Sequence, residues 1–287
     1  MSAMHAKESG VRTWTVPVDE LPPKLQLKEW LVRTPLVGPW AQRFYKEYVG
    51  LEGNDLTKHL IEIRRQAFEV CKYRCVASFL FVNYNLEEKY GSDFYDHIFR
   101  RISCGERFLD LACGFGNIAR NLVYDGAPEE NIISTDLRGE FWDLGYQMFR
   151  DRERFNGDFR QGDVFDKDYL HDLDGTIDIL HTSAFLHLFD VSLQQKILRR
   201  ILQLMSSKPG TIIFGRQVGN TIPYQVLKHS MRPGRGLYQH NEESFKAMFK
   251  EVTDEWDIQV WLTPRMESLY ENGGRIGSLR FIITRIR

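Results

Sequence analysis

Glycines and acids in the middle of the chain have the types and spacing of a nucleotide-cofactor site. Residues 108–117, FLDLACGFGN, place Asp110 inside an apolar run and Gly114 and Gly116 directly after it. Glycines allow a tight turn whose backbone can approach a ligand closely. Asp136, 20 residues beyond Gly116, could accept hydrogen bonds from both hydroxyls of a ribose. This spacing is typical of dinucleotide sites and also of sites for other adenosyl cofactors.

Two further acidic features distinguish these cofactors. A carboxylate beside a pyrophosphate would repel it, whereas Asp110 can meet the cationic amino group of S-adenosylmethionine. Asp163, in the stretch GDVF, can accept from an adenine amino group, with Val164 beside it to hold the ring. An acid in a buried strand is costly unless it is paired or functional, which argues against a merely solvated Asp110. The acids together predict S-adenosylmethionine as the cofactor.

Alternating strands and helices from residue 105 onward would bring these residues to one edge of a sheet. Strands are predicted at 107–111, 131–136, 159–164, 176–182 and 211–214, and helices at about 117–124 and 140–152. Ser192 and Gln195 form a capping-box pair that predicts the start of the next helix, and Gly126 suits a left-handed C-cap. Such alternation means parallel strands joined by right-handed crossovers, with ligands at the carboxyl ends of the strands.

The last part of the chain breaks this alternation. A helix at about 242–251, capped by Asn241, is followed by strands at 256–262 and 279–284 with little between them. Two adjacent final strands suggest an antiparallel hairpin at the sheet edge, which matches the seven-stranded sheet of class I methyltransferases. An NAD-dependent oxidoreductase is disfavoured by Asp110 and by the missing Tyr-x-x-x-Lys arrangement. A binding module without turnover is the third alternative, and the acids argue against it.

The region before residue 105 differs in composition from the rest. Residues 1–25 carry little periodic apolar content and are predicted to be a flexible arm. Residues 26–104 are predicted to be an aromatic-rich helical cap for substrate and dimer contacts, and 105–287 the cofactor-binding core. Apolar residues at helical spacing paint one helix face in the cap, namely Leu56, Leu60, Ile63, Ala67 and Val70.

Composition excludes several classes of function. The 287 residues are 43% hydrophobic and carry a formal net charge of -1, so no overall basic field invites nucleic acid or an anionic membrane. No apolar run approaches the roughly 20 residues of a spanning helix. The 4 cysteines form no C-x-x-C pair and are expected to be reduced thiols. We expect a cytoplasmic protein without a metal site.

Longer stretches carry a resemblance to a known family. DLACGFG at 110–116 resembles motif I of class I S-adenosylmethionine-dependent methyltransferases, with Ala112 where many members have glycine. SAFLHLFD at 183–190 and GRQVGN at 215–220 resemble the fungal methyltransferases of meroterpenoid (polyketide-terpenoid) pathways. The resemblance covers most of the chain from about residue 40. It implies O-methylation of the carboxyl group of a farnesylated, orsellinate-derived acid, by a homodimer.

The fold class expected from these arguments is α/β, a doubly wound and mostly parallel seven-stranded Rossmann-like sheet with an N-terminal helical cap. The alanine in motif I is expected to be tolerated, provided that its backbone does not need a positive φ. The predicted cofactor-binding residues are Asp110, Ala112, Gly114, Gly116, Asp136, Leu137, Asp163, Val164 and Thr182.

Three residues outside the cofactor motif are candidates for handling the acceptor. His187 either orients the acceptor or takes its proton, and His240 could also reach the pocket; for both, structural packing is an equal alternative. Arg216 could pair with a substrate carboxylate at two points, or hold a loop at 215–220 by a salt bridge. Residues 220–236 could form a substrate lid or a plain surface excursion.

The choice of acceptor decides whether a base is needed. A carboxylate, with a pKa of about 4, is already ionised near neutral pH, whereas a phenol, with a pKa of about 10, would gain from a general base. The alternatives to the carboxyl group are a phenol, nitrogen or carbon of another small metabolite.

Overall fold

The computed structural model describes residues 32–226, 236–269 and 273–287. The predicted arm at 1–25 and most of the predicted lid at 220–236 lie outside these residues. By its internal contacts the chain divides into two compact units, Met1–Asn85 with Asp143–Arg154, and Leu86–Trp142 with Phe155–Arg287.

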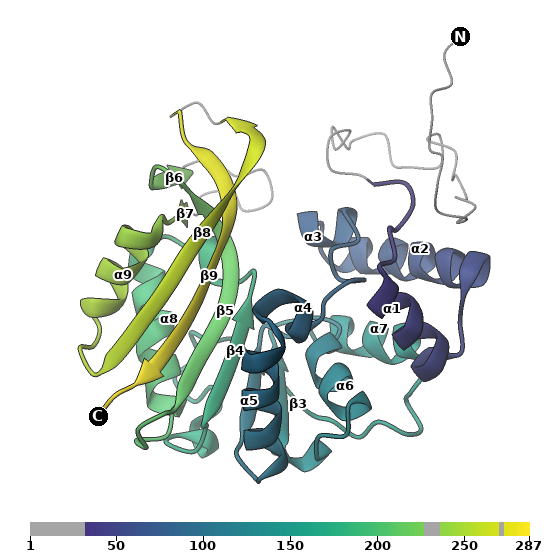
Figure 1. The fold of residues 1–287 in the computed structure, drawn as a ribbon, viewed down its shortest axis with the longest axis horizontal. Coiled ribbons are helices and arrows are strands. Elements are labelled where there is room, and N and C mark those ends of the chain that lie inside the picture. The colour runs from purple at the N-terminus through teal and green to yellow at the C-terminus, as the bar shows by residue number, and fades with distance from the viewer. Residues whose placement is uncertain (1–31, 227–235, 270–272) are drawn as a thin grey trace. The chain divides into compact units, whose positions relative to one another are not determined.

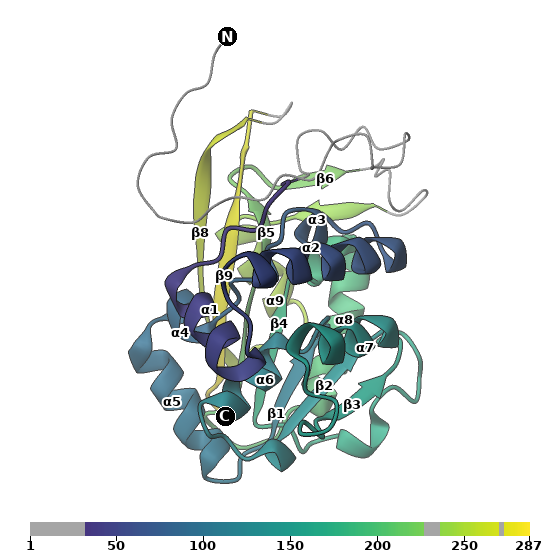
Figure 2. The ribbon, with the colours of Figure 1, turned by 90° about the vertical axis from the view of Figure 1, so that its right-hand side faces the viewer.

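The second unit is built on a seven-stranded sheet with the order β3-β2-β1-β4-β5-β9-β8. Its strands are β1 (Phe108–Leu111), β2 (Ile132–Asp136), β3 (Asp158–Gln161), β4 (Ile179–Ser183), β5 (Ile212–Asn220), β8 (Trp256–Leu269) and β9 (Arg275–Arg285). The first five are parallel, β9 is antiparallel to both of its neighbours, and the order from β3 to β4 can be followed in Figure 2. The predicted doubly wound sheet with a closing hairpin is confirmed.

Short elements and helices complete this unit. Strands β6 (Tyr224–Val226) and β7 (Leu237–Gln239) form a separate two-stranded sheet. The helices are α4 (Leu86–Tyr90), α5 (Ser92–Ser103), α6 (Asn117–Tyr124), α8 (Val191–Leu204) and α9 (Glu242–Lys250), together with the first residues of α7 (Gly139–Phe149). None of the helices in the described ranges has both the length and the apolar character that a membrane crossing requires.

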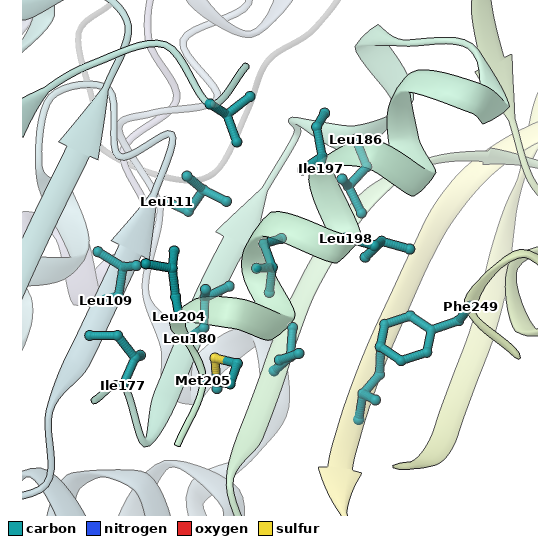
Figure 3. Close-up of a cluster of buried hydrophobic side chains, with 14 of the residues drawn as sticks. Leu109, Leu111, Ile177, Leu180, Leu186, Ile197, Leu198, Leu204, Met205 and Phe249 are labelled. Atoms are coloured by element: carbon teal, nitrogen blue, oxygen red, sulfur yellow. The ribbon is translucent and has the colours of Figure 1, made fainter. Parts of the chain in front are cut away.

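The two faces of the sheet pack against different helices (Figure 1). On one face, Leu109 and Leu180 of the strands join Leu198 of α8 and Phe249 of α9 in the main apolar core (Figure 3). Because side chains alternate along a strand, Phe214 points to the other face, where the rings of Tyr90 and Phe94 lie 5.2 and 5.1 Å from its centroid. Helices α4 and α5 therefore cover that other face.

The first unit is a helical aromatic cluster. Its elements are α1 (Pro39–Phe44), a π-helix (Tyr45–Val49), α2 (Gly53–Val70), α3 (Arg74–Ala77) and the rest of α7. Tyr45 stacks on Phe149 with ring centroids 6.1 Å apart, and the Tyr48 hydroxyl donates to Asp151 Oδ2 over 2.9 Å. The predicted apolar face of α2 is confirmed, since Leu56, Leu60, Ile63 and Ala67 are buried and Val70 is half-buried.

Several predicted boundaries differ from the structure. Helix α8 is capped by Asp190, whose carboxylate accepts from the Leu193 backbone N–H over 3.0 Å, so the predicted cap at Ser192 is wrong. An aspartate is as good a cap as a serine and stands earlier in the chain. The predicted left-handed cap at Gly126 is confirmed by its φ of 101°. Strand β5 runs to Asn220 because β9 pairs with its whole length.

Candidate cofactor and acceptor site

The motif I turn between β1 and α6 holds three residues in the left-handed conformation. The φ angles are 61° at Ala112, 55° at Gly114 and 69° at Gly116. A Cβ at Gly116 would lie 2.4 Å from the Trp142 ring, whereas one at Gly114 would meet nothing within 4 Å. Packing against Trp142 thus requires a glycine at position 116, whereas open space lies beside Gly114.

Ala112 departs from what the sequence led us to expect. The proviso that its backbone needs no positive φ is wrong, since φ is 61°. The left-handed region costs a non-glycine residue about 1–2 kcal/mol because Cβ approaches a carbonyl oxygen. Ala184, directly after β4, also has a positive φ of 54°, and its N–H donates to the Arg216 carbonyl over 2.7 Å. Strained residues of this kind cluster at functional sites, and these two follow neighbouring strands.

Asp110 is paired inside the sheet with a residue that the sequence argument did not connect to it. His181 on β4 stands opposite Asp110 in register, and its Nδ1 lies 2.7 Å from Asp110 Oδ1, with both side chains 3% exposed. The imidazole N–H donated to the carboxylate offsets the cost of burying the acid. Both residues lie inside predicted strands, which is the signal that could have connected them. That signal indicates a pair only once the strand order is known to put β1 beside β4.

Asp136 ends β2 and faces the motif I turn. Its Oδ2 accepts from the Gly114 N–H over 2.9 Å, and its Oδ1 from the Arg138 N–H over 3.0 Å. Burial raises the pKa of Asp136, and these two backbone N–H groups oppose the rise. Next to it, Leu137 is an exposed apolar side chain. The carboxylate is therefore held in one orientation at the end of the strand.

The remaining predicted cofactor residues follow β3 and end β4. Strand β3 stops at Gln161, earlier than predicted, so Asp163 and Val164 lie in the loop after it. Asp163 Oδ1 accepts from the Phe165 N–H over 3.0 Å, and Val164 is buried. The Thr182 hydroxyl is buried and has no hydrogen-bond partner among the described residues.

The residues present fit an S-adenosyl cofactor. Asp110 lies in β1, Asp136 ends β2 and Asp163 follows β3, three strands that are adjacent in the sheet, and open space lies beside Gly114 in the turn after β1. Thr182 stands level with the last residue of β1 and offers a buried hydroxyl without a partner in the described ranges. No group of three or more metal-ligating side chains is found in the part of the chain that the structure describes.

Arg216 lies on β5 and not in a loop after it. The alternative of a loop at 215–220 is wrong, because this segment pairs with β9 residue by residue. Arg216 stands opposite Ser183, the last residue of β4, and its Nε donates to Ser278 Oγ over 3.3 Å. Within the described ranges no acid forms an ion pair with its guanidinium.

The two candidate histidines lie in different surroundings. His187 is half-buried in a short 3-10 helix, Leu186–Leu188, which begins three residues after the end of β4. His240 is 1% exposed, and its Nδ1 lies 2.9 Å from Ser244 Oγ. Burial lowers the pKa of His240 to about 4, so this imidazole is neutral at pH 7 and a weak base there.

Comparison with known proteins agrees with this geometry. Residues 30–82 match the model of the meroterpenoid methyltransferase N-terminal domain, and residues 108–208 match a methyltransferase domain. "Methyltransferase adrK" of Penicillium roqueforti is 31% identical over 77% of this chain and 78% of its own. The chain belongs to the meroterpenoid methyltransferase family.

Two other similar proteins match over a smaller share of their own length. "O-methyltransferase atr3" of Stereocaulon alpinum is 32% identical over 75% of this chain and 62% of its own. "Asnovolin E/Chermesin D methyltransferase nvfJ" of Aspergillus novofumigatus is 34% identical over 62% of this chain and 64% of its own. The chain thus spans a little under two thirds of these two relatives.

The fold of the meroterpenoid methyltransferase core recurs in solved structures. A putative sarcosine dimethylglycine methyltransferase from Galdieria sulphuraria matches 78% of this chain and 98% of its own with a TM-score of 0.53, at 12% identity. The family makes the chain an S-adenosylmethionine-dependent methyltransferase, and the NAD-dependent alternative falls away.

Proposed function

We propose that this methyltransferase forms a methyl ester on the carboxyl group of a farnesylated, orsellinate-derived meroterpenoid intermediate. The observation that carries the proposal is Arg216, a half-buried guanidinium at the carboxyl edge of the sheet that no described acid neutralises. A planar guanidinium matches a carboxylate at two points. The name of nvfJ, a methyltransferase of asnovolin E and chermesin D, supports a small-molecule acceptor.

The proposed mechanism needs positioning more than proton transfer. S-adenosylmethionine supplies a methyl group on a positively charged sulfur. The methyl carbon would pass to a carboxylate oxygen of the acceptor, and the electron pair of the breaking carbon–sulfur bond would remain on sulfur. The acceptor is already ionised near pH 7, so no proton is removed. Alignment of the two reactants then accounts for much of the rate.

The side chains have separate roles in this mechanism. Asp110 accepts a hydrogen bond from the amino group of the cofactor, Asp136 accepts from its ribose hydroxyls, and Asp163 accepts from its adenine amino group. Thr182, at the end of β4, borders the same site. Arg216 orients the acceptor carboxylate, and His187 orients the acceptor without acting as a base. His240 is buried with a pKa of about 4, which argues against a part for it as a base near pH 7. The helical cap as a substrate and dimer region, the homodimer and the cytoplasmic location remain proposals as well.

Product analysis tests the reaction. The protein is incubated with methyl-labelled S-adenosylmethionine and farnesylated orsellinic acid, and the product is analysed by mass spectrometry and NMR. A labelled methyl ester is expected, whereas a phenolic ether or a ring methyl would favour the alternative acceptors. With a carboxylate acceptor, His187→Ala keeps substantial activity and Arg216→Ala mainly raises KM. Complete loss of turnover in His187→Ala, with binding intact, would instead indicate a phenol and a general base.

A further inference from the structure

Two arginines face each other across the last antiparallel strand pair. Arg216 of β5 stands opposite Arg280 of β9 in register, so both side chains leave the same face of the sheet. Like charges directly opposite each other on a strand pair destabilise it. Arg280 Nε is buried and has no hydrogen-bond partner in the described part of the chain. Such an arrangement lowers stability unless a negative group completes it.

A third cation approaches the same place from a helix. Tyr90 of α4 packs on Phe214, which lies on this face two residues before Arg216. Its neighbour Lys89 is half-buried, and its pKa is lowered first by burial and then by the positive charges of Arg216 and Arg280. Lys89 is therefore within electrostatic range of both guanidinium groups. We call Lys89, Arg216 and Arg280 the cationic triad.

The chain supplies little negative charge to the cationic triad. The acid that acts on Lys89 is Glu88, an exposed neighbour in the sequence whose charge ranks below that of Arg216 in its effect. In the ranges that the structure describes, no ion pair links any of the three cations to an acid. Trp261 of β8 stands opposite Arg280 and is half-buried, so an aromatic side chain borders the triad. Cations beside an aromatic ring suit an aromatic acid.

We propose that the cationic triad is the carboxylate site of the acceptor acid, and that it distinguishes the ionised acid from its methyl ester. This inference rests on the proposed function. In the transfer, the carboxylate loses its negative charge and the sulfonium its positive charge, and no proton is released. The ester is neutral, so the charge that holds the substrate no longer holds the product. The triad therefore binds the acid and releases the ester without a conformational switch.

Calorimetry on the full chain saturated with S-adenosylhomocysteine tests the site. The probes are farnesylated orsellinic acid and its methyl ester at pH 7.5. We expect the acid to bind at least about tenfold more tightly than the ester, as for one lost charge-assisted contact. Lys89→Met and Arg280→Met should each weaken acid binding about tenfold and leave ester and S-adenosylhomocysteine binding unchanged. Arg280→Lys should retain part of the acid affinity, and Lys196→Met, an exposed cation on α8, should retain all of it.

Stability provides a second readout that needs no ligand. Removing one of three repelling cations should leave the melting temperature of Lys89→Met and Arg280→Met unchanged or higher. A fall in melting temperature, or failure to fold, would assign these residues a structural role and overturn the inference. Equal binding of acid and ester would also overturn it. No binding of either probe, with S-adenosylhomocysteine still bound, would instead overturn the proposed acceptor and with it the inference, so the two failures are distinguishable.

Discussion

The two sides of the sheet's carboxyl edge carry opposite charges. Asp110 lies in β1, Asp136 ends β2 and Asp163 follows β3. The cationic triad lies on β5, β9 and α4. Between them β4 ends in the uncharged Thr182 and Ser183. S-adenosylmethionine is a cation at its sulfur and its amino group, and an acceptor acid is an anion. The comparison teaches that strand order, together with the packing of α4 on one face, puts opposite charges on the two sides of the carboxyl edge, which suits a cationic cofactor and the proposed anionic acceptor.

Neutralising the acidic side should have the largest effect. In Asp110→Asn the shape is kept, but the cofactor's amino group loses its charged partner and buried His181 loses its ionic acceptor. Affinity for S-adenosylhomocysteine should fall about 100- to 1000-fold, or about 3–4 kcal/mol, as for a broken buried pair. Calorimetry measures this. The control Asp143→Asn removes an exposed carboxylate paired with Arg152 and should stay within about twofold. Unchanged binding of S-adenosylhomocysteine to Asp110→Asn would show that this carboxylate does not hold the cofactor, and would contradict the role proposed for the acidic side.

His240 tests whether the basic side gains further charge at neutral pH. Its carbonyl accepts from the Asn220 N–H of β5 over 2.9 Å, and burial lowers the pKa of its imidazole to about 4. A depressed folded pKa favours the neutral form, so the contribution to stability is complete above the unfolded pKa of about 6.5 and is lost between there and about pH 4. The free energy of unfolding should fall by about 3 kcal/mol over this interval.

Urea unfolding at several pH values measures this contribution. Subtracting the curve of His240→Gln isolates it from His59, whose pKa burial also lowers. A difference that stays constant from pH 7 to pH 4 would mean that His240 has the same pKa in the folded and unfolded states, so that it adds a charge to the basic side once the pH falls below about 6.5.

Much of the fold follows from the sequence because apolar runs and glycines delimit its elements. Helix α6 begins and ends where predicted, since Gly116 and Gly126 bracket it with positive φ angles. The acids Asp110 and Asp136 follow from the same logic, because a buried run places its last residues at the carboxyl edge. The closing hairpin is likewise readable from two adjacent strand patterns without a helix between them.

The rest depends on which strands become neighbours. Residues 215–220 carry two glycines and three polar side chains, which locally favour a loop, but pairing with β9 overrides that preference. The Asp110–His181 pair requires β4 beside β1, and the Arg216–Arg280 pair requires β9 beside β5. Lys89 lies near these two arginines only because helix α4 packs on Phe214. Charge on the basic side is therefore assembled by tertiary structure and has no local signature.

Reversing one charge should abolish the contrast between the two sides. In Arg280→Glu the new carboxylate stands opposite Arg216 and can pair with it, so the acceptor's place is taken by the protein. Affinity for the farnesylated acid should fall about 30-fold, or about 2 kcal/mol, with S-adenosylhomocysteine binding unchanged. The free energy of unfolding should rise by about 0.5 kcal/mol, because a repelling pair becomes an attractive one.

Calorimetry and denaturant unfolding check the two effects together. Arg199→Glu, on an exposed part of α8, changes the net charge equally and should alter neither quantity. If it weakens acid binding as much as Arg280→Glu does, the basic side acts only through its long-range field.

The smallest expected effect concerns the strain stored on the acidic side. Ala112→Gly relieves a left-handed alanine, worth about 1–2 kcal/mol, but adds backbone freedom to the unfolded chain worth about 0.5–1 kcal/mol. The net result should be a gain of about 0.5 kcal/mol in the free energy of unfolding, measured by urea denaturation. Ala119→Gly inside α6 is the matched control and should lose about 1 kcal/mol, since its backbone is helical. A loss at both positions would show that the turn around Ala112 holds its left-handed conformation without measurable strain.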